Sequence, residues 1–371
     1  MNAKMNWKPG GRLAAFAVAA AMVVLAVGPA RAGGTPPPPP PPQKVPWYFT
    51  VHAGEINYDL GKANQAFTKL KDLGGKGVRT DVFWRDIEPA RGVWDYGKLQ
   101  FYTNFVSNIR WHGLEPLIIF SNAPDWAVQL YGQDKAAFWA AYERYIREVV
   151  LWIGDRVNHY QLWNEANHLI DPIDAADDWQ LFARAGAVVR NLDPAARTYI
   201  NVMANLAGWE AAVTDWLVKA GSYIDVIGID HYPGTWACCF YTDWGPLDTL
   251  LQRINTPGNP WYGKDGAILE TGYSSWAWLL ADEYDQRDFI SQALPVIRTK
   301  VNSNNATRPY QVVVLGWYQL IDTCTDQFNP GNCWVNGGVY GMGPEAHFGI
   351  IHSDYSNKVG YGALKTEIGK F

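Results

Sequence analysis

The stretch Tyr160-Gln161-Leu162-Trp163-Asn164-Glu165 runs from a short, mostly apolar segment into two polar residues. A second stretch, Ala267-Ile268-Leu269-Glu270-Thr271-Gly272, has the same pattern 105 residues later. Short apolar runs indicate strands buried on both faces, as in a parallel sheet covered by helices, so a carboxylate at each C-terminal end lies on a barrel rim. The sequence therefore predicts that Glu165 and Glu270 meet, and such a pair is the equipment for cleaving a glycosidic bond.

Short apolar runs alternate with longer helical patterns along the chain, which predicts parallel βα units. We expect strands at 48–52, 77–83, 115–120, 157–162, 198–202, 226–230, 267–270 and 312–320. We expect helices at 62–73, 96–111, 135–153, 177–192, 209–220, 246–254 and 283–300. Eight strands close a barrel, so the predicted fold is α/β, a single (β/α)8 TIM barrel. Long loops follow the sixth and eighth strands, at 234–244 and 322–344.

The N-terminal part of the chain predicts export. Residues 1–32 combine three early basic residues, an apolar stretch and Ala30-Arg31-Ala32, which together form a signal peptide. A membrane anchor is disfavoured because the apolar stretch is shorter than the ~20 residues that a span needs. Residues 33–45 hold seven consecutive prolines and form a linker, which leaves residues 46–371 as the catalytic domain. We expect a secreted or periplasmic protein.

The charge balance bears on the class of partner. Without the signal peptide the chain has 27 basic and 36 acidic residues, a formal charge of −9. An acidic body without Lys/Arg runs argues against nucleic acid and anionic membranes as partners. The 19 Trp and 20 Tyr residues favour a carbohydrate partner weakly, since flat rings stack on sugars but also fill cores. We expect a monomer with no membrane span.

Four cysteines suit an oxidising compartment. Cys324 and Cys333 close a short loop, while Cys238 and Cys239 are adjacent in sequence, and all three disulfide pairings stay open. A metal site is disfavoured because neither CxxC spacing nor a nearby His pair accompanies them. The sequence therefore predicts disulfide bonds, no metal and no cofactor.

Polar and aromatic residues gather at the predicted C-terminal strand ends, which face one basin in such a barrel. They are His52, Arg79, Asp81, Trp84, Asn122, Asn164, Glu165, Asp230, His231, Tyr232, Glu270 and Trp317. For His52 and Asp81, a structural ion pair is an equally good interpretation. For Trp84, Trp126 and Trp317, core packing is the alternative to a stacking surface for sugar rings.

The motifs carry a family resemblance over nearly the whole chain after the linker. Asn164-Glu165 and Glu270 resemble the paired strand-four and strand-seven residues of the clan A retaining glycoside hydrolases, which have (β/α)8 barrels. The segments 78–89, 92–96, 231–233, 348–351 and 361–365 resemble further parts of that clan. Within it, the chain is most similar to family 39, which holds β-xylosidases, α-L-iduronidases and exopolysaccharide hydrolases. Ala166 departs from the Pro of many relatives.

The resemblance implies a double displacement with two glutamates in different roles. Glu270 would be the nucleophile, kept ionised by Arg79 and by a hydrogen bond from Tyr232. Glu165 would be the acid and then the base, with a pKa that is raised in the free enzyme and falls once Glu270 is esterified. The implied substrate-binding residues are Arg79, Trp84, Asn122, Asn164, His231, Tyr232, Trp317 and His52, with Asn164 on the sugar 2-hydroxyl.

Several alternatives stay open at this point. An inverting hydrolase would hold its carboxyl groups ~6.5–9.5 Å apart, and a transglycosylase would pass the same covalent intermediate to a sugar acceptor. A catalytically inactive polysaccharide-binding barrel is a different class. A Schiff-base aldolase is disfavoured because none of the predicted strands contains a lysine. The sugar, its linkage, and endo or exo action are not readable from the residues.

Overall fold

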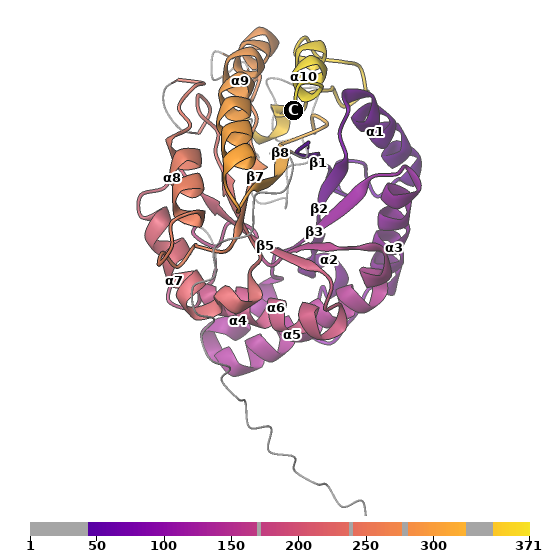
Figure 1. Ribbon diagram of the computed structural model, residues 1–371. Coiled ribbons are helices and arrows are strands. Elements are labelled where there is room, and N and C mark those ends of the chain that lie inside the picture. Colours follow the sequence, from indigo (N-terminus) through magenta and orange to yellow (C-terminus); the bar gives the residue numbers. More distant parts are fainter. Residues whose placement is uncertain (1–43, 169–171, 237–239, 277–280, 324–343) are drawn as a thin grey trace, which may run out of the picture. The chain divides into compact units, whose positions relative to one another are not determined.

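The computed structural model describes residues 44–168, 172–236, 240–276, 281–323 and 344–371. Eight parallel strands close into one barrel in sequence order, with β8 pairing back to β1 (Figure 1). The strands are β1 Trp47–Thr50, β2 Gly77–Phe83, β3 Glu115–Ser121, β4 His159–Gln161, β5 Arg197–Met203, β6 Val226–Asp230, β7 Asp265–Glu270 and β8 Val312–Trp317. The predicted (β/α)8 barrel is confirmed.

Helices surround the barrel, and at least one helix follows each strand before the next strand begins (Figure 1). They are α1 Leu60–Leu73, α2 Trp84–Ile87, α3 Tyr96–Trp111, α4 Asp125–Gln133, α5 Lys135–Ile153, α6 Asp178–Leu192, α7 Trp209–Ala220, α8 Gly245–Ile254, α9 Glu283–Thr307 and α10 Tyr361–Ile368. The expected helices all form. The short α2 and α4 and the terminal α10 are additions that the periodicity did not indicate.

The second and sixth strands have the predicted bounds, and of the other six the fourth and the eighth shorten most. The fourth was expected to span 157–162 and is limited to three residues, His159–Gln161, so that Asn164 and Glu165 lie in the turn beyond it. The eighth was expected to reach residue 320 and ends at Trp317, where a cis peptide joins Tyr318 to Gln319. Both strands therefore leave the barrel wall sooner than their apolar runs suggest.

The barrel interior has an apolar zone and a polar zone. One buried cluster holds side chains that alternate inward along the strands: Tyr48, Leu117, Ile119, Tyr199, Val226, Ala267, Leu269 and Val314. The intervening positions belong to a second, larger cluster that is shared with the helices. This alternation follows from the two-residue period of a strand. Further toward the C-terminal strand ends, inward positions carry polar groups such as Arg79, Gln161 and Asn201.

Aspartates begin several of the helices, which is expected because a short carboxylate satisfies free N–H groups at a helix start. The Asp59 side chain accepts from the backbone N–H groups of Gly61 and Lys62 at the start of α1. At the start of α9, Asp282 and Asp285 form a reciprocal capping box. These caps fix where each helix begins after its loop.

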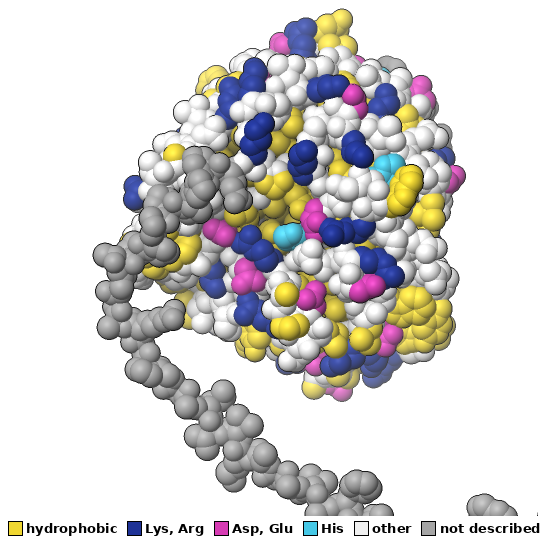
Figure 2. Space-filling model, turned by 45° about the vertical axis from the view of Figure 1, so that its right-hand side comes forward, with side chains coloured by type: hydrophobic (Ala, Val, Ile, Leu, Met, Phe, Trp, Pro, Cys, Tyr) yellow, Lys and Arg dark blue, Asp and Glu magenta, His cyan; other side chains and the backbone are white. Residues whose placement is uncertain are grey.

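The described surface bears on the expected partners. None of the helices within the described residues is long and apolar enough to cross a membrane. On the face that Figure 2 presents, basic and acidic side chains are scattered among uncharged ones. The predicted signal peptide, most of the linker and all four cysteines lie outside the described residues, so those expectations stay predictions.

Close contact between β7 and β8 yields a stability prediction. A Cβ on Gly316 would lie 2.0 Å from the carbonyl oxygen of Leu269, whereas a Cβ on Gly362 in α10 would meet nothing within 4 Å. We expect Gly316→Ala to lower the free energy of unfolding by roughly 3 kcal/mol or more, because backbone must move. Gly362→Ala, the control, should raise it by about 0.5–1 kcal/mol. Chemical denaturation followed by circular dichroism measures both, and equal midpoints would contradict the packing.

Candidate active site

Three carboxyl groups meet at the C-terminal end of the barrel. Glu165 lies just after β4, Asp230 ends β6 and Glu270 ends β7. One carboxylate oxygen from each lies within 4.8 Å of the other two. The predicted encounter of Glu165 and Glu270 is therefore present, and Asp230 joins them.

Two groups contact the carboxylate of Glu270. Nη1 of Arg79 lies 2.5 Å from its Oε1, and the Tyr232 hydroxyl donates to its Oε2 at 2.5 Å. The Glu270 side chain is 9% exposed, so these contacts replace most of the water that would otherwise solvate the charge. A cation and a hydrogen-bond donor both favour the ionised carboxylate.

Arg79 is itself bound on every side by protein. Its Nε donates to Oε1 of Gln161 at 2.9 Å, Nη2 donates to Oδ1 of Asn164 at 2.9 Å, and Nη1 donates to Oγ1 of Thr50 at 3.4 Å. The residue is 1% exposed. The guanidinium therefore orients Glu270 and Asn164 and has no face that a ligand can reach.

Glu165 stands in a different environment from Glu270. Its backbone N–H donates to Oδ1 of Asn201 at 2.8 Å, and its φ of 45° lies in the left-handed region, where a non-glycine residue is strained. Burial raises the pKa of the Glu165 carboxyl well above its usual range, and the charges of Glu270 and Asp230 raise the pKa further. The two glutamates therefore stand in different electrostatic surroundings.

Asp230 was expected at a strand end, but no role was predicted for it. It is 1% exposed, hydrogen-bonds Glu165 through its side chain, and accepts from Nδ2 of Asn201. Among the described residues, its Oδ1 has no hydrogen-bond partner. Burial, and then the charge of Glu270, raise the pKa of Asp230 well above its usual range. The Glu165–Asp230 pair therefore retains a proton that isolated carboxyl groups would lose.

Asn201 was missed, although it occupies an inward position two residues after the inward Tyr199 on β5. Its Nδ2 donates to Oδ1 of Asn164 at 3.0 Å and to Asp230, while its Oδ1 accepts from Glu165. Counting inward positions along the strand could have found it.

The Asn164 amide has a fixed orientation. Its Oδ1 accepts from Arg79, from Nε2 of Gln161 at 3.1 Å, and from Asn201. Within the described residues no group accepts from its Nδ2. Because three donors point at one terminal atom of the amide, that atom is the oxygen and the other is Nδ2. Nδ2 is therefore left as a donor for a ligand.

His52 and Asp81 form a buried ionic group beside the site. Nδ1 of His52 lies 2.8 Å from Oδ2 of Asp81, and the His52 backbone N–H donates to Oε2 of Glu55 at 3.0 Å. Burial opposes the charge on His52, but Glu55 and Asp81 outweigh it and raise its pKa. Burial raises the pKa of Glu55 to about 7. These contacts agree with the interpretation of His52 and Asp81 as a structural ion pair, and His52 is only 1% exposed.

Trp84 and Trp317 do not lie with the carboxyl groups. Trp84 is fully buried, stacks on Tyr145 and donates from Nε1 to Glu88. Trp317 is also fully buried and packs beside Phe289 of α9. Both belong to the core shared with the helices, so their prediction as surfaces for sugar rings is corrected to core packing. Trp126, the remaining candidate, is partly exposed and donates from Nε1 to the carbonyl of Glu88.

His231 and Asn122 occupy the rim of the barrel, and their expected contacts with substrate stay predictions. Nε2 of His231 lies 2.7 Å from the carbonyl of Asp243, and burial lowers the pKa of this histidine. Asn122 is half-buried, with a φ of 56°, and its carbonyl accepts from the N–H of Arg85.

A fourth carboxyl group, Glu345, was missed together with Tyr318. The Tyr318 hydroxyl donates to Oε2 of Glu345 at 2.9 Å, and the Tyr318 ring packs edge-on against Tyr232. Burial raises the pKa of Glu345 to about 7, and the charge of Glu270 contributes. Glu345 follows the long predicted loop, so only the folded chain brings it beside β8.

No family model matches the chain. Its fold matches many solved structures, among them a family 39 glycoside hydrolase from Bacteroides cellulosilyticus WH2, with a TM-score of 0.63 and 18% identity over 88% of this chain and 64% of that one. An exo-β-1,4-mannosidase from Opitutaceae bacterium strain TAV5 matches with a TM-score of 0.65 and 15% identity over 88% and 59%. The family 1 β-glucosidase of Thermotoga maritima matches with a TM-score of 0.62 and 14% identity over 89% of this chain and 98% of that one.

The barrel has the same fold as these glycoside hydrolases. This is consistent with the resemblance that the motifs carry. The matched part of the chain spans less than two thirds of the first two structures. At these identities the likeness establishes the barrel fold alone, and a fold by itself does not assign a reaction.

Asn201 offers a test of the site's architecture. Asn201→Ala would leave the N–H of Glu165 and an oxygen of Asp230 without their partner, so we expect the free energy of unfolding to fall by about 1–3 kcal/mol. Asn64→Ala, at an exposed amide on α1, is the control and should change it by less than about 0.5 kcal/mol. Denaturant titration measures both, and an unchanged midpoint for Asn201→Ala would argue against the network.

Proposed function

We propose that this protein is a retaining glycoside hydrolase that cleaves a poly- or oligosaccharide by double displacement, with Glu270 as the nucleophile and Glu165 as the acid and base. The observation that carries the proposal is the close carboxyl cluster with unequal surroundings. Glu270 has a cation and a hydroxyl donor, whereas Glu165 has burial and two negative neighbours. This asymmetry is what separates a nucleophile from an acid.

The first step forms a glycosyl-enzyme ester. A carboxylate oxygen of Glu270 attacks the anomeric carbon while Glu165 transfers its proton to the glycosidic oxygen, so the leaving group departs as an alcohol. Once Glu270 is esterified its charge is gone, and the pKa of Glu165 falls. In the second step Glu165 takes a proton from water, whose oxygen attacks the anomeric carbon and releases Glu270.

The carboxylate spacing favours retention over inversion. Inverting enzymes need ~6.5–9.5 Å between the two groups to admit a water molecule, and retaining enzymes have about 5–5.5 Å. A carboxylate oxygen of Glu165 lies within 4.8 Å of one of Glu270, which supports the shorter spacing of retaining enzymes. Transfer of the intermediate to a sugar acceptor would use the same residues, and the products distinguish it from hydrolysis.

Two neighbours have supporting roles in this proposal. Asn164 presents Nδ2 to the sugar 2-hydroxyl, since its Oδ1 is occupied by three donors. Asp230 is a positioning residue, because it hydrogen-bonds Glu165 and holds the acid in its protonated form. Its negative charge acts on the pKa of Glu165 and not on the substrate.

The glutamate variants test the mechanism. We expect Glu165→Gln to reduce turnover by roughly 10²–10⁴-fold and Glu270→Gln to abolish the covalent intermediate, with both proteins folded by circular dichroism. Glu143→Gln, at a partly exposed glutamate on α5 that pairs with Arg184 away from the site, is the control. Mass spectrometry after treatment with 2-fluoro glycosyl fluorides of several sugars should show one added glycosyl group in the wild type and none in Glu270→Gln. Near wild-type turnover in either variant would refute the mechanism.

The pair Glu165–Asp230 predicts a pH effect with a defined sign. Glu165 must be protonated for the first step, and the charge of Asp230 raises its pKa. Asp230→Asn removes that charge, so the pKa of Glu165 should fall and the alkaline limb of kcat/KM should move to lower pH. The profile of kcat/KM against pH measures this. If the alkaline limb stays in place or moves to higher pH, Asp230 does not raise the pKa of Glu165 and is not a positioning residue.

A further inference from the structure

Negative groups outnumber positive ones around the proposed nucleophile. Glu165, Asp230 and Glu270 lie together, and Glu345 is near enough to raise the pKa of Glu165. The cation in contact with this group is Arg79, which pairs with Glu270. A ligand that binds here therefore enters an environment with uncompensated carboxyl groups.

The nearby cations are already committed to protein partners. Arg79 is 1% exposed and is bound by Glu270, Gln161, Asn164 and Thr50. His52 is equally buried and lies between Asp81 and Glu55, as described above. Buried ion pairs of this kind give up a partner only at a large cost. Neither cation is available to an anionic ligand.

Two further cations occur near this end of the barrel. Lys358 is buried, and its Nζ binds both oxygens of Asp322, at 2.9 and 2.8 Å. Arg85, which follows β2, is partly exposed and lies over the ring of Phe83 at 5.2 Å. Arg85 is thus the cation to examine if an acidic ligand does bind.

The four internal segments that the structure does not describe contain no basic residue. The segments 169–171, 237–239, 277–280 and 324–343 contain no Lys, Arg or His in their sequence. They contain two acidic residues, Asp171 and Asp326. Wherever these segments lie, they add no positive charge to the site.

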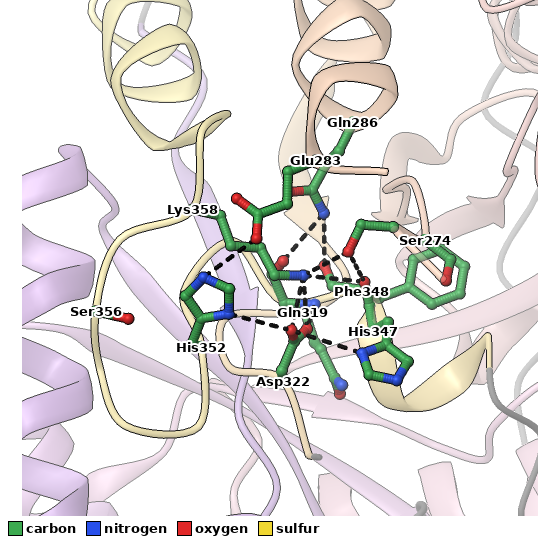
Figure 3. A network of polar contacts seen from close by, with 12 residues as sticks. Ser274, Glu283, Gln286, Gln319, Asp322, His347, Phe348, His352, Ser356 and Lys358 are labelled. Carbon is green, nitrogen blue, oxygen red and sulfur yellow. Dashed lines mark hydrogen bonds and ion pairs between the residues drawn. The ribbon is translucent and has the colours of Figure 1, made fainter. Parts of the chain in front are cut away.

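The segment that carries Glu345 is held by a network of polar contacts around Asp322 and Lys358, which Figure 3 shows. Asp322 accepts from Lys358 and from the N–H of Gly349 at 2.8 Å, and Lys358 also donates to the carbonyl of His347 at 3.2 Å. These bonds hold the segment that carries Glu345 against the end of β8. Nε2 of Gln319 donates to the Glu345 carbonyl at 3.2 Å.

One oxygen of Glu345 remains open to a ligand. Oε2 accepts from the Tyr318 hydroxyl. Within the described residues, Oε1 has no hydrogen-bond partner, and Glu345 is partly exposed. Above its pKa, which burial raises to about 7, the Glu345 carboxylate only accepts hydrogen bonds, so its partner is then a hydroxyl or an ammonium group.

We propose that the sugar bound beside Glu270 carries no anionic substituent, and that Glu345 is a specificity-determining residue that accepts a hydrogen bond from this sugar through Oε1. The inference rests on the proposed glycosidase function and names its substrate class: uncharged or amino sugars, and not uronic acids or sulfated sugars. A carboxylate in this position would meet like charges in partly desolvated surroundings, which is unfavourable and discriminates against it.

The test compares matched polysaccharides that differ in the acidity of their sugars. Galactan and polygalacturonate, mannan and polymannuronate, and glucan and glucuronan are incubated with the full-length enzyme at 0.15 M salt, and reducing ends are measured. We expect the neutral member of the cleaved pair to react at least roughly tenfold faster, the effect of a like charge at short range. Equal or faster cleavage of the acidic member overturns the inference and points to Arg85.

Three variants separate charge from packing. Glu345→Gln should narrow the neutral-to-acidic ratio, whereas Glu345→Asp keeps the charge and should preserve the ratio. Asp72→Asn removes an exposed charge near the end of α1 and should leave the ratio unchanged. If Glu345→Gln leaves the ratio unchanged, the assignment of Glu345 is wrong. If no polysaccharide of either kind is cleaved, the proposed function fails, a result distinct from cleavage of the acidic members.

Discussion

The buried ion pair between Arg79 and Glu270 is the constraint on which the rest of the site depends. A guanidinium inside the barrel is tolerated only when acceptors surround it, and β1, β2, β4 and β7 each contribute to that arrangement through Thr50, Arg79, Gln161 and Glu270. Arg79 is paired with Glu270, so its positive charge does not balance the neighbouring carboxyl groups of Glu165 and Asp230. Glu165 and Asp230 must therefore keep a proton between them, and this is the condition that an acid catalyst requires.

The barrel separates stability from chemistry along its axis. Inward side chains such as Tyr199 and Leu269 fill the lower interior with apolar contacts, whereas Asn201 and Asp230, further along their strands, carry the polar groups. The polar end also holds the left-handed backbone of Glu165 and an oxygen of Asp230 that has no hydrogen-bond partner among the described residues. Costs of this kind are tolerated at functional sites because the surrounding packing holds them in place.

Much of the fold and the centre of the site could be predicted from the sequence. The eight short apolar runs indicated the barrel, and the two glutamates were placed together because parallel strands end on one rim. Arg79, Asn164 and Tyr232 also lie where expected. The side-chain directions of Trp84 and Trp317 could not be predicted in the same way. A residue's position at a strand end does not show whether its side chain points into the barrel or toward the helices. Gly316 occupies the inward position, so Trp317 faces α9.

The sequence by itself thus determined the order of the elements and the approximate place of each strand, because local periodicity and apolar runs specify secondary structure. Only the tertiary structure decided that Asn201 and Asp230 bind Glu165, and that Glu345 and Tyr318 join the site. Those contacts depend on barrel closure and on residues far apart in the chain. Charge interactions act through space over such contacts, and spacing along the sequence does not encode them.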